Sequence, residues 1–491
     1  MCICPSDPPT DCDDPLLEST SHTSSPAQPR SGLARSLKTR HMTMIAIGGA
    51  IGAGLFVGSG AVIKTAGPAA ILSYVLAGAL VLCTLRMLGE MVVAKPRTGA
   101  FADYARMGIG PWAGFTLGWL YWYYYVIIIA VEAVAGAKIL SVWVGLPLWL
   151  VAMLLMAVMT VTNLISVRWF GEFEFWFSGI KVAAIVSFIV LGLLWVLGLW
   201  PGDTSGLSNL VSHGGFAPNG FGSILGAVVV VIFAFGGAEI VTIAAAESAE
   251  PAKSVAKATT GVIWRIILFY VGSIFLVVCI LPWNDASVLS SPYVAALDKL
   301  HIPGAGAIMN FVILTAVLSV LNSSIYTSSR MLRVLASHGD APEWLVRTNT
   351  RGVPTRAVLA STVVGWVSVV LAYIAPDSLF LFLVNSCGVV AIFMYVMIGI
   401  SELRVRRAIE REDPSKLTLK MWFFPYLTIA VIACFVLVLV AMLFQADQRV
   451  QLLASVVSLV VVLAAYALRK RYGQVPVDAE VAEVAKLDEP A

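Results

Sequence analysis

Two glycine-rich segments interrupt apolar stretches of this 491-residue chain, and both make backbone groups available for chemistry. The first is residues 48–54 (GGAIGAG), and the second is residues 233–239 (FAFGGAE). Glycine weakens a helix. A helix broken inside a membrane leaves peptide groups that only protein or a wet cavity can cover. Two such breaks at matching places of two halves are typical of a secondary transporter's substrate site.

The peptide groups freed at such breaks suit the two ends of a small zwitterion. A half-helix N-terminus offers N–H donors and a positive dipole end, so the N–H groups near Gly52, Ala53 and Gly54 are expected to bind a carboxylate. The carbonyls freed at Ala50 and Gly236 can accept hydrogen bonds from an ammonium group. The small residues of both segments would let a substrate approach the backbone closely.

Two aromatic residues flank the second break. Phe233 and Phe235 lie on either side of Ala234. A phenyl ring at this place could cover a bound substrate and exclude water. The alternative is that each ring packs against lipid or the protein core, as most phenylalanines in membrane helices do.

Three of the ionisable residues within apolar stretches are the main functional hypotheses. Lys181 lies near the start of the apolar residues 177–199, and desolvation disfavours its charge, so its amine could take up and release a coupled proton. The alternative for Lys181 is that it snorkels to the interface. Glu132 and Glu239 could be protonated or paired with a cation. Glu239 adjoins the second break and can contact the same site.

The composition shows which elements must position these residues. Hydrophobic residues make up 59% of the chain and charged residues 12%, and the mean hydropathy is +0.88. A spanning helix needs about 20 apolar residues. We therefore expect an all-α integral membrane protein with twelve transmembrane helices. The predicted spans are residues 43–65, 68–92, 111–139, 147–167, 177–199, 222–246, 260–282, 306–334, 356–375, 379–400, 422–444 and 451–468.

The two breaks also predict an internal repeat. Residues 43–199 hold five spans that begin with a broken helix, and so do residues 222–400. Because five is an odd number, the second set must enter from the opposite face, which gives an inverted 5+5 repeat. The last two spans, within residues 422–468, lie outside it. Glycines also allow close packing of membrane helices, which is the simpler explanation for a single break.

Charge predicts the orientation in the membrane. Lys and Arg concentrate in alternate loops, with Lys299 and Arg449 as the clear exceptions. Because cytoplasmic loops carry the excess of positive charge, we expect both termini in the cytoplasm and the protein in the plasma membrane. Residues 33–471 form the predicted transmembrane domain. Residues 1–32 and 472–491 are too polar to form a packed core and are expected to be disordered cytoplasmic tails.

No enzyme constellation is found in the sequence. There is no Walker A motif for ATP, no spaced His/Cys set for a metal and no basic stretch beyond those that set topology. We therefore expect no cofactor, no nucleic acid and no obligatory protein partner. A channel would need a continuous polar pathway or a ring of charges, whereas these spans carry isolated ionisable groups. A non-transporting nutrient sensor of the same architecture remains an alternative.

Five motifs resemble the bacterial amino acid permeases of the amino acid–polyamine–organocation superfamily. The resemblance runs from about residue 33 to residue 471 and implies a LeuT-like fold with proton-coupled uptake of an amino acid. It also implies that the breaks hold the substrate, that Phe233 is the gating aromatic and that Lys181 replaces the sodium of sodium-driven relatives. The motifs are residues 47–56 (IGGAIGAGLF), 89–91 (GEM), 171–176 (GEFEFW), 237–248 (GAEIVTIAAAES) and 329–332 (SRML).

The substrate follows from the resemblance alone. The members that take up γ-aminobutyrate are the most similar, so that amino acid is the expected substrate. Another amino acid, such as proline, asparagine or an aromatic one, is the alternative. The sequence alone does not indicate how far apart the amine and the carboxylate of the ligand must be.

Overall fold

The computed structural model of the chain describes residues 51–95, 100–165, 167–201, 206–239, 251–289, 291–349, 353–374 and 376–472. Within these ranges the regular secondary structure is helical and contains no strand, which confirms the predicted all-α class for this part of the chain. Residues 48–50, which include the predicted carbonyl of Ala50, lie outside the described residues. So do the end of the predicted sixth span, the predicted N-terminal tail and residues 473–491, while residue 472 of the predicted C-terminal tail ends α18.

Nine helical stretches of the described residues are long and apolar enough to cross a membrane, and α9 and α15 contain shorter apolar helices. Each of the twelve predicted spans overlaps a described helix. The helices are α2 (Ala53–Phe56), α3 (Gly58–Ala66), α4 (Ala70–Ala94), α5 (Ala100–Gly108), α6 (Pro111–Val144), α7 (Leu148–Ile165), α8 (Val167–Val196), α9 (Gly222–Ala234), α11 (Pro251–Arg265), α12 (Ser273–Ile280), α13 (Pro292–Lys299), α14 (Ala305–Ser337), α15 (Thr355–Ile374), α16 (Pro376–Glu412), α17 (Tyr426–Phe444) and α18 (Ala446–Tyr472). Short 3₁₀ turns lie at Gly67–Ala69, Ser208–Leu210, Ala286–Leu289, Glu343–Leu345 and Pro414–Lys416.

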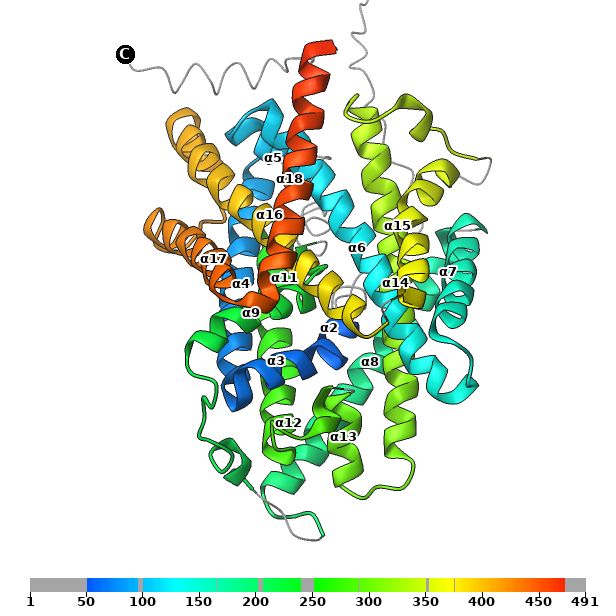
Figure 1. Cartoon of the computed structure of the whole chain (residues 1–491). Coiled ribbons are helices and arrows are strands. Elements are labelled where there is room, and N and C mark those ends of the chain that lie inside the picture. Colours follow the sequence, from blue (N-terminus) through cyan, green and yellow to red (C-terminus); the bar gives the residue numbers. More distant parts are fainter. Residues whose placement is uncertain are drawn as a thin grey trace, which may run out of the picture.

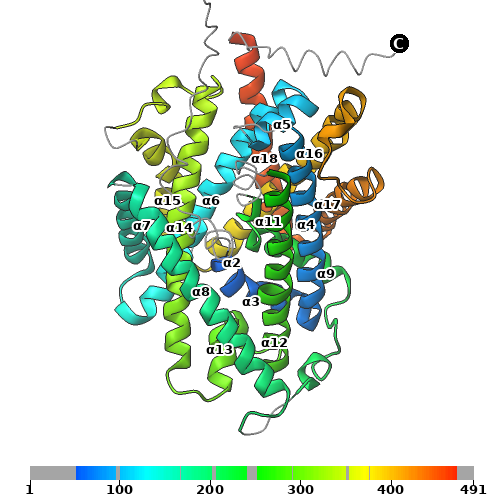
Figure 2. The same ribbon diagram turned by 180° about the vertical axis from the view of Figure 1, so that it is seen from behind.

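Helices α6, α14 and α16 form the centre of the bundle. The helix α6 packs along α14 and against α16, and both views place α6 beside α14 (Figures 1 and 2). It begins at Pro111, where a missing N–H costs nothing, and ends at Val144, before Gly145 in the left-handed conformation that glycine favours. The apolar part of α16 is 78% buried, whereas that of α18 is 11% buried. The outer helices therefore offer their apolar side chains to lipid.

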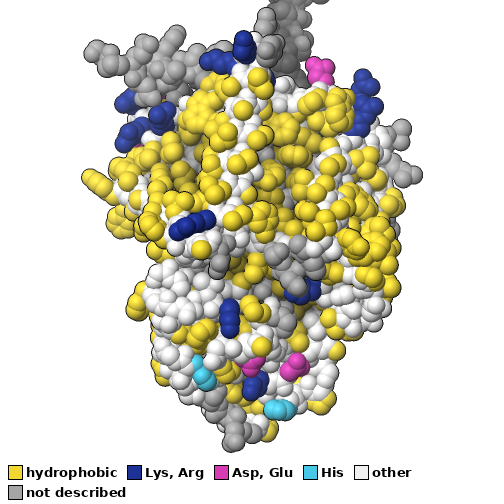
Figure 3. All heavy atoms as spheres, in the orientation of Figure 1, with side chains coloured by type: hydrophobic (Ala, Val, Ile, Leu, Met, Phe, Trp, Pro, Cys, Tyr) yellow, Lys and Arg dark blue, Asp and Glu magenta, His cyan; other side chains and the backbone are white. Residues whose placement is uncertain are grey.

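The surface has the pattern of a membrane protein. Hydrophobic side chains cover a broad band of the face in Figure 3, and Lys and Arg side chains gather beyond it at the end where α18 finishes. The last turn of α18 carries Arg469, Lys470 and Arg471. Large apolar side chains of the outer helices, such as Val457, Val460 and Val461, are exposed. Because lipid tails solvate such side chains, this band fits the hydrocarbon layer.

The described parts of both glycine-rich segments depart from regular helix. Ile51 and Gly52 are not helical and α2 begins only at Ala53, while α9 ends at Ala234 and is followed by a turn. Gly237 in that turn has a φ of 91°, a conformation that glycine adopts without a steric penalty. The helix α2 contacts α6, α9 and α14 (Figure 1). The two breaks thus meet at the central helices.

A π-helical segment, Ile266–Gly272, joins α11 to α12 and provides a contact to the second break. Its wider turn places the hydroxyl of Tyr270 within 3.0 Å of the carbonyl oxygen of Ala234, to which it donates a hydrogen bond. This bond satisfies a carbonyl in the last turn of α9, where intrahelical partners run out. π-helical turns are frequent at functional sites.

Candidate functional site

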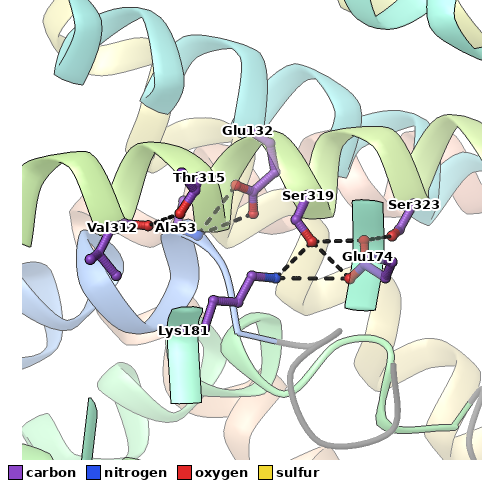
Figure 4. A network of polar contacts seen from close by, with 8 residues as sticks. All are labelled: Ala53, Glu132, Glu174, Lys181, Val312, Thr315, Ser319 and Ser323. Carbon is purple, nitrogen blue, oxygen red and sulfur yellow. Dashed lines mark hydrogen bonds and ion pairs between the residues drawn. The ribbon is translucent and has the colours of Figure 1, made fainter. Parts of the chain in front are cut away.

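The first break is held by a carboxylate of the protein. Ala53 is the first residue of α2, and its backbone N–H donates to both carboxylate oxygens of Glu132 on α6, at 3.2 and 3.3 Å (Figure 4). Both residues are buried. A Cβ at Gly52 would lie 2.7 Å from Oε1 of Glu132, so only glycine leaves room for this carboxylate. Glu132 therefore occupies a donor that the sequence assigns to the substrate.

The second break is stabilised by Glu239. Its Oε2 accepts a hydrogen bond from the N–H of Gly237 at 3.1 Å, and its Oε1 accepts one from the hydroxyl of Tyr125 on α6 at 3.4 Å. Glu239 is buried, as the sequence predicts for a residue beside the break. The N–H of Gly236 donates to the carbonyl of Phe233 at 3.0 Å and closes the turn. Helix α6 thus supplies a polar side chain to each break.

The hydroxyl of Tyr124 lies against Gly236. A Cβ added at Gly236 would overlap this hydroxyl oxygen, so the absence of a side chain there makes room for the phenol. Tyr124 is buried, and its hydroxyl has no hydrogen-bond partner among the described residues. Its ring packs edge to face on that of Tyr125, with centroids 5.4 Å apart. A buried polar group of this kind is costly unless a ligand or water completes it.

The two phenylalanines occupy different surroundings. The ring of Phe233 faces the first break, because a Cβ at Gly54 would lie 3.1 Å from its Cδ1. The ring of Phe235 packs on Tyr270 instead, with centroids 4.6 Å apart. Both are buried. Of the two, Phe233 is the one whose ring lies between the breaks.

Lys181 lies at the centre of a buried polar network between α8 and α14. Its Nζ donates to the Oγ of Ser319 at 2.8 Å and lies 4.0 Å from Oε1 of Glu174 (Figure 4). The lysine is 0% exposed, so it does not snorkel to the interface in this structure. Figure 4 shows Glu132 of α6 in the same group of polar side chains. The predicted proton carrier is thus near the carboxylate that binds the first break.

Glu174 is the ionisable residue of this network that the sequence analysis does not single out. It is buried and accepts from Ser319 at 2.7 and 2.8 Å and from Ser323 at 3.1 Å. Its spacing from Lys181 is seven residues, or two helical turns, so both lie on one face of α8. Glu174 also lies inside the motif at residues 171–176. This position and the seven-residue spacing are the sequence signals that could have identified Glu174.

The described residues contain no group of three or more His, Cys, Asp or Glu side chains that could hold a metal ion. The ionisable groups of the site are instead three carboxylates and one amine, bound to hydroxyls and backbone N–H groups. Such groups can hold a charged organic ligand and exchange protons.

Comparisons with known proteins place this geometry in context. A family model described as amino acid permease matches residues 41–475. The gamma-aminobutyric acid permease of Bacillus subtilis is 52% identical over 447 residues, which cover 90% of this chain and 95% of that protein. The permease of the same name from Escherichia coli is 47% identical over 426 residues, covering 86% and 91%.

A solved structure shares the fold. The crystal structure of a mutant manganese transporter from Eremococcus coleocola matches with a TM-score of 0.55, covering 94% of this chain and 97% of that one. Its sequence identity is 12%, so the likeness concerns the fold alone. The similarity extends over nearly the whole chain.

Proposed function

Because the chain belongs to the amino acid permease family, we propose that it takes up an amino acid across the plasma membrane by proton-coupled symport, with γ-aminobutyrate as the substrate. The observation that carries the coupling is the fully buried Lys181, bonded to Ser319 beside a broken helix. The substrate assignment is supported by the relatives named gamma-aminobutyric acid permease.

The proposal includes the complete architecture. We infer twelve transmembrane helices, built as an inverted 5+5 repeat followed by α17 and α18. The contact between α2 and α9, the broken helices that open the two halves, supports this arrangement. Both termini are then cytoplasmic, in agreement with the basic residues in the last turn of α18.

The substrate would bind along α6, between the two breaks. Tyr124 and Glu132 are eight residues apart and share a face of α6, about 12 Å along its axis at 1.5 Å per residue. Glu132 contacts the first break and Tyr124 the second. In this proposal the substrate carboxylate takes over the N–H of Ala53, and the ammonium group points toward Glu239 and the hydroxyl of Tyr124.

Proton binding and substrate binding are linked at Glu132. An ionised Glu132 and a substrate carboxylate are like charges that compete for one donor, so only one of them can hold it. Neutralisation of Glu132 would free the N–H of Ala53 for the substrate. Lys181, which faces the same region, would carry the proton through the transport cycle.

Transport by the purified protein tests this function. Reconstituted into proteoliposomes, it should accumulate labelled γ-aminobutyrate in response to an inward proton gradient, and protein-free liposomes should not. Competition with proline, asparagine and aromatic amino acids then tests the substrate. Preference for one of these competitors would overturn the γ-aminobutyrate assignment, and saturable flux distinguishes a carrier from a channel or a sensor.

A further inference from the structure

Glu174 is linked to Lys181 through a bridging hydroxyl, which a simple counter-ion would not need. The amine donates to the Oγ of Ser319 at 2.8 Å, and that oxygen donates to Glu174 at 2.7 Å. The direct separation of Nζ and Oε1 is 4.0 Å, beyond the 2.7–3.2 Å of an ordinary N–H···O bond. Within the described residues, the hydroxyl of Ser319 is therefore the hydrogen-bonded link between amine and carboxylate (Figure 4).

This chain of groups has a direction. Glu174 is seven residues nearer the start of α8 than Lys181, about 10.5 Å along the helix axis. The second serine on Glu174, Ser323, is one turn closer to the end of α14 than Ser319, and that end carries Arg330 and Arg333. The basic loops mark this side as cytoplasmic. The carboxylate thus lies on the cytoplasmic side of the amine.

We propose that Glu174 receives the proton of Lys181 through the hydroxyl of Ser319 and passes it to water on the cytoplasmic side. One N–H bond of the ammonium breaks as the Ser319 oxygen gains that proton, and the original hydroxyl proton moves to the carboxylate. The products are a neutral amine, an unchanged serine and a neutral carboxylic acid. Loss of the proton from Glu174 to water then completes the step. Chains of paired ionisable groups are typical of proton pathways in membranes.

The charge balance permits this transfer. A buried ion pair and the neutral pair that replaces it carry the same net charge, so the step leaves no isolated charge in a dry environment. The carboxylate of Glu132 on α6, drawn in the same close-up, is bonded to Ala53 (Figure 4). When the substrate leaves and Glu132 regains that bond, Glu174 remains the acceptor on the cytoplasmic side.

The test uses the full chain in proteoliposomes and rests on the proton coupling proposed above. Two quantities are measured: uptake driven by a proton gradient, and exchange of labelled for unlabelled γ-aminobutyrate at equal pH. Exchange moves the loaded carrier in both directions and needs no net proton release. Glu174→Gln keeps the hydrogen-bonding shape but cannot accept the proton. We expect it to retain exchange and to lose about 10²-fold in driven uptake, the usual contribution of a positioned proton-transfer group.

Two serine variants separate a proton path from general packing. Ser319 and Ser323 both donate to Glu174, and only Ser319 also accepts from Lys181. Ser319→Ala should lose driven uptake as Glu174→Gln does, whereas Ser323→Ala should retain it. Glu174→Asp, which keeps the carboxyl group, should restore part of the driven uptake.

The outcomes are distinct. If wild-type protein shows no gradient-driven uptake, the proposed function is wrong, and the role of Glu174 falls with it. If the wild type is driven by the gradient and Glu174→Gln is driven equally well, the relay is wrong. Two other results would reduce Glu174 to a packing residue. One is an equal loss of driven uptake in Ser319→Ala and Ser323→Ala. The other is a loss of both exchange and driven uptake in Glu174→Gln.

Discussion

The carboxylate of Glu132 accepts a hydrogen bond from the backbone N–H of Ala53 at 3.2 Å, so a side chain from α6 closes the broken end of α2. Glu132 is 1% exposed and Ala53 is fully buried. The same donor is the one that a substrate carboxylate would use. The structure therefore places a protein group and a ligand group in competition for one N–H.

This competition predicts the pH dependence of substrate binding. An ionised Glu132 repels the substrate carboxylate and holds the donor, whereas the protonated acid does neither. Wild-type binding should therefore become tighter as the pH falls through the titration of Glu132. Glu132→Gln mimics the neutral form and should bind with an affinity that varies little with pH. Titration calorimetry at several pH values measures this, and an unchanged pH dependence in the variant would assign the effect to another group.

Gly54 and Gly58 provide a matched pair for the packing of the first break. A Cβ at Gly54 would lie 2.6 Å from the Cα of Ala234, whereas one at Gly58 would meet its nearest atom at an ordinary 3.5 Å. Gly54→Ala should cost about 1–3 kcal/mol of stability and abolish substrate binding, with Gly54→Val more severe. Gly58→Ala should be neutral or stabilising by up to about 1 kcal/mol. Thermal unfolding and binding of the detergent-solubilised variants test both, and normal affinity in Gly54→Val would contradict this placement.

Tyr124 and Gly236 predict a reciprocal rescue. Gly236→Ala should block transport, because the new Cβ would overlap the Tyr124 hydroxyl. Tyr124→Phe removes that oxygen, so the double variant should recover part of the stability that Gly236→Ala loses. Tyr124→Phe alone should change the order of preference among amino acids, since its hydroxyl has no partner in the described part of the chain. Competition of a panel of amino acids with labelled uptake measures this preference. An unchanged order of preference in Tyr124→Phe would exclude Tyr124 from substrate recognition.

Glu239 is expected to contribute to the site through the second break. Its bonds to Gly237 and Tyr125 fix the turn that follows α9. Glu239→Gln keeps the size of the side chain but removes its charge, and we expect lower transport with an altered pH dependence. Uptake rates across mildly acidic and mildly alkaline pH test this. A wild-type profile would make Glu239 a packing residue.

The all-helical class and the apolar spans were predictable because apolar length is a local property of the chain. The position of Lys181 in an apolar stretch and the break after Ala234 were likewise visible in the sequence. The bond between Glu132 and Ala53 joins residues 79 positions apart, and that between Ser319 and Glu174 joins residues 145 apart. Such pairings depend on how α6, α8 and α14 pack, which no local pattern contains.

The separation of Phe233 from Phe235 is another product of packing. The two rings are two residues apart, yet one faces Gly54 and the other packs at a tilt on Tyr270. The sequence offers both as candidates for covering the substrate, because both flank the break. The end of α9 at Ala234 and the turn that follows decide which ring lies near the first break.

The central claim is that Lys181 carries the proton that drives uptake. Its amine is fully buried and bonded to Ser319, so Lys181→Ala removes the positive charge that lies beside Glu174. Lys181→Ala should lose accumulation of γ-aminobutyrate against its gradient, while exchange at equal pH persists at a reduced rate. Retained exchange also shows that the variant is folded.

The most direct measurement is uptake of labelled γ-aminobutyrate into proteoliposomes with and without an imposed inward proton gradient, for the wild type and Lys181→Ala side by side. We predict that the gradient drives accumulation by the wild type and has no effect on the variant. Accumulation by Lys181→Ala in response to the gradient would contradict the account, because the proton would then be carried elsewhere, with Glu132 and Glu239 as the next residues to test.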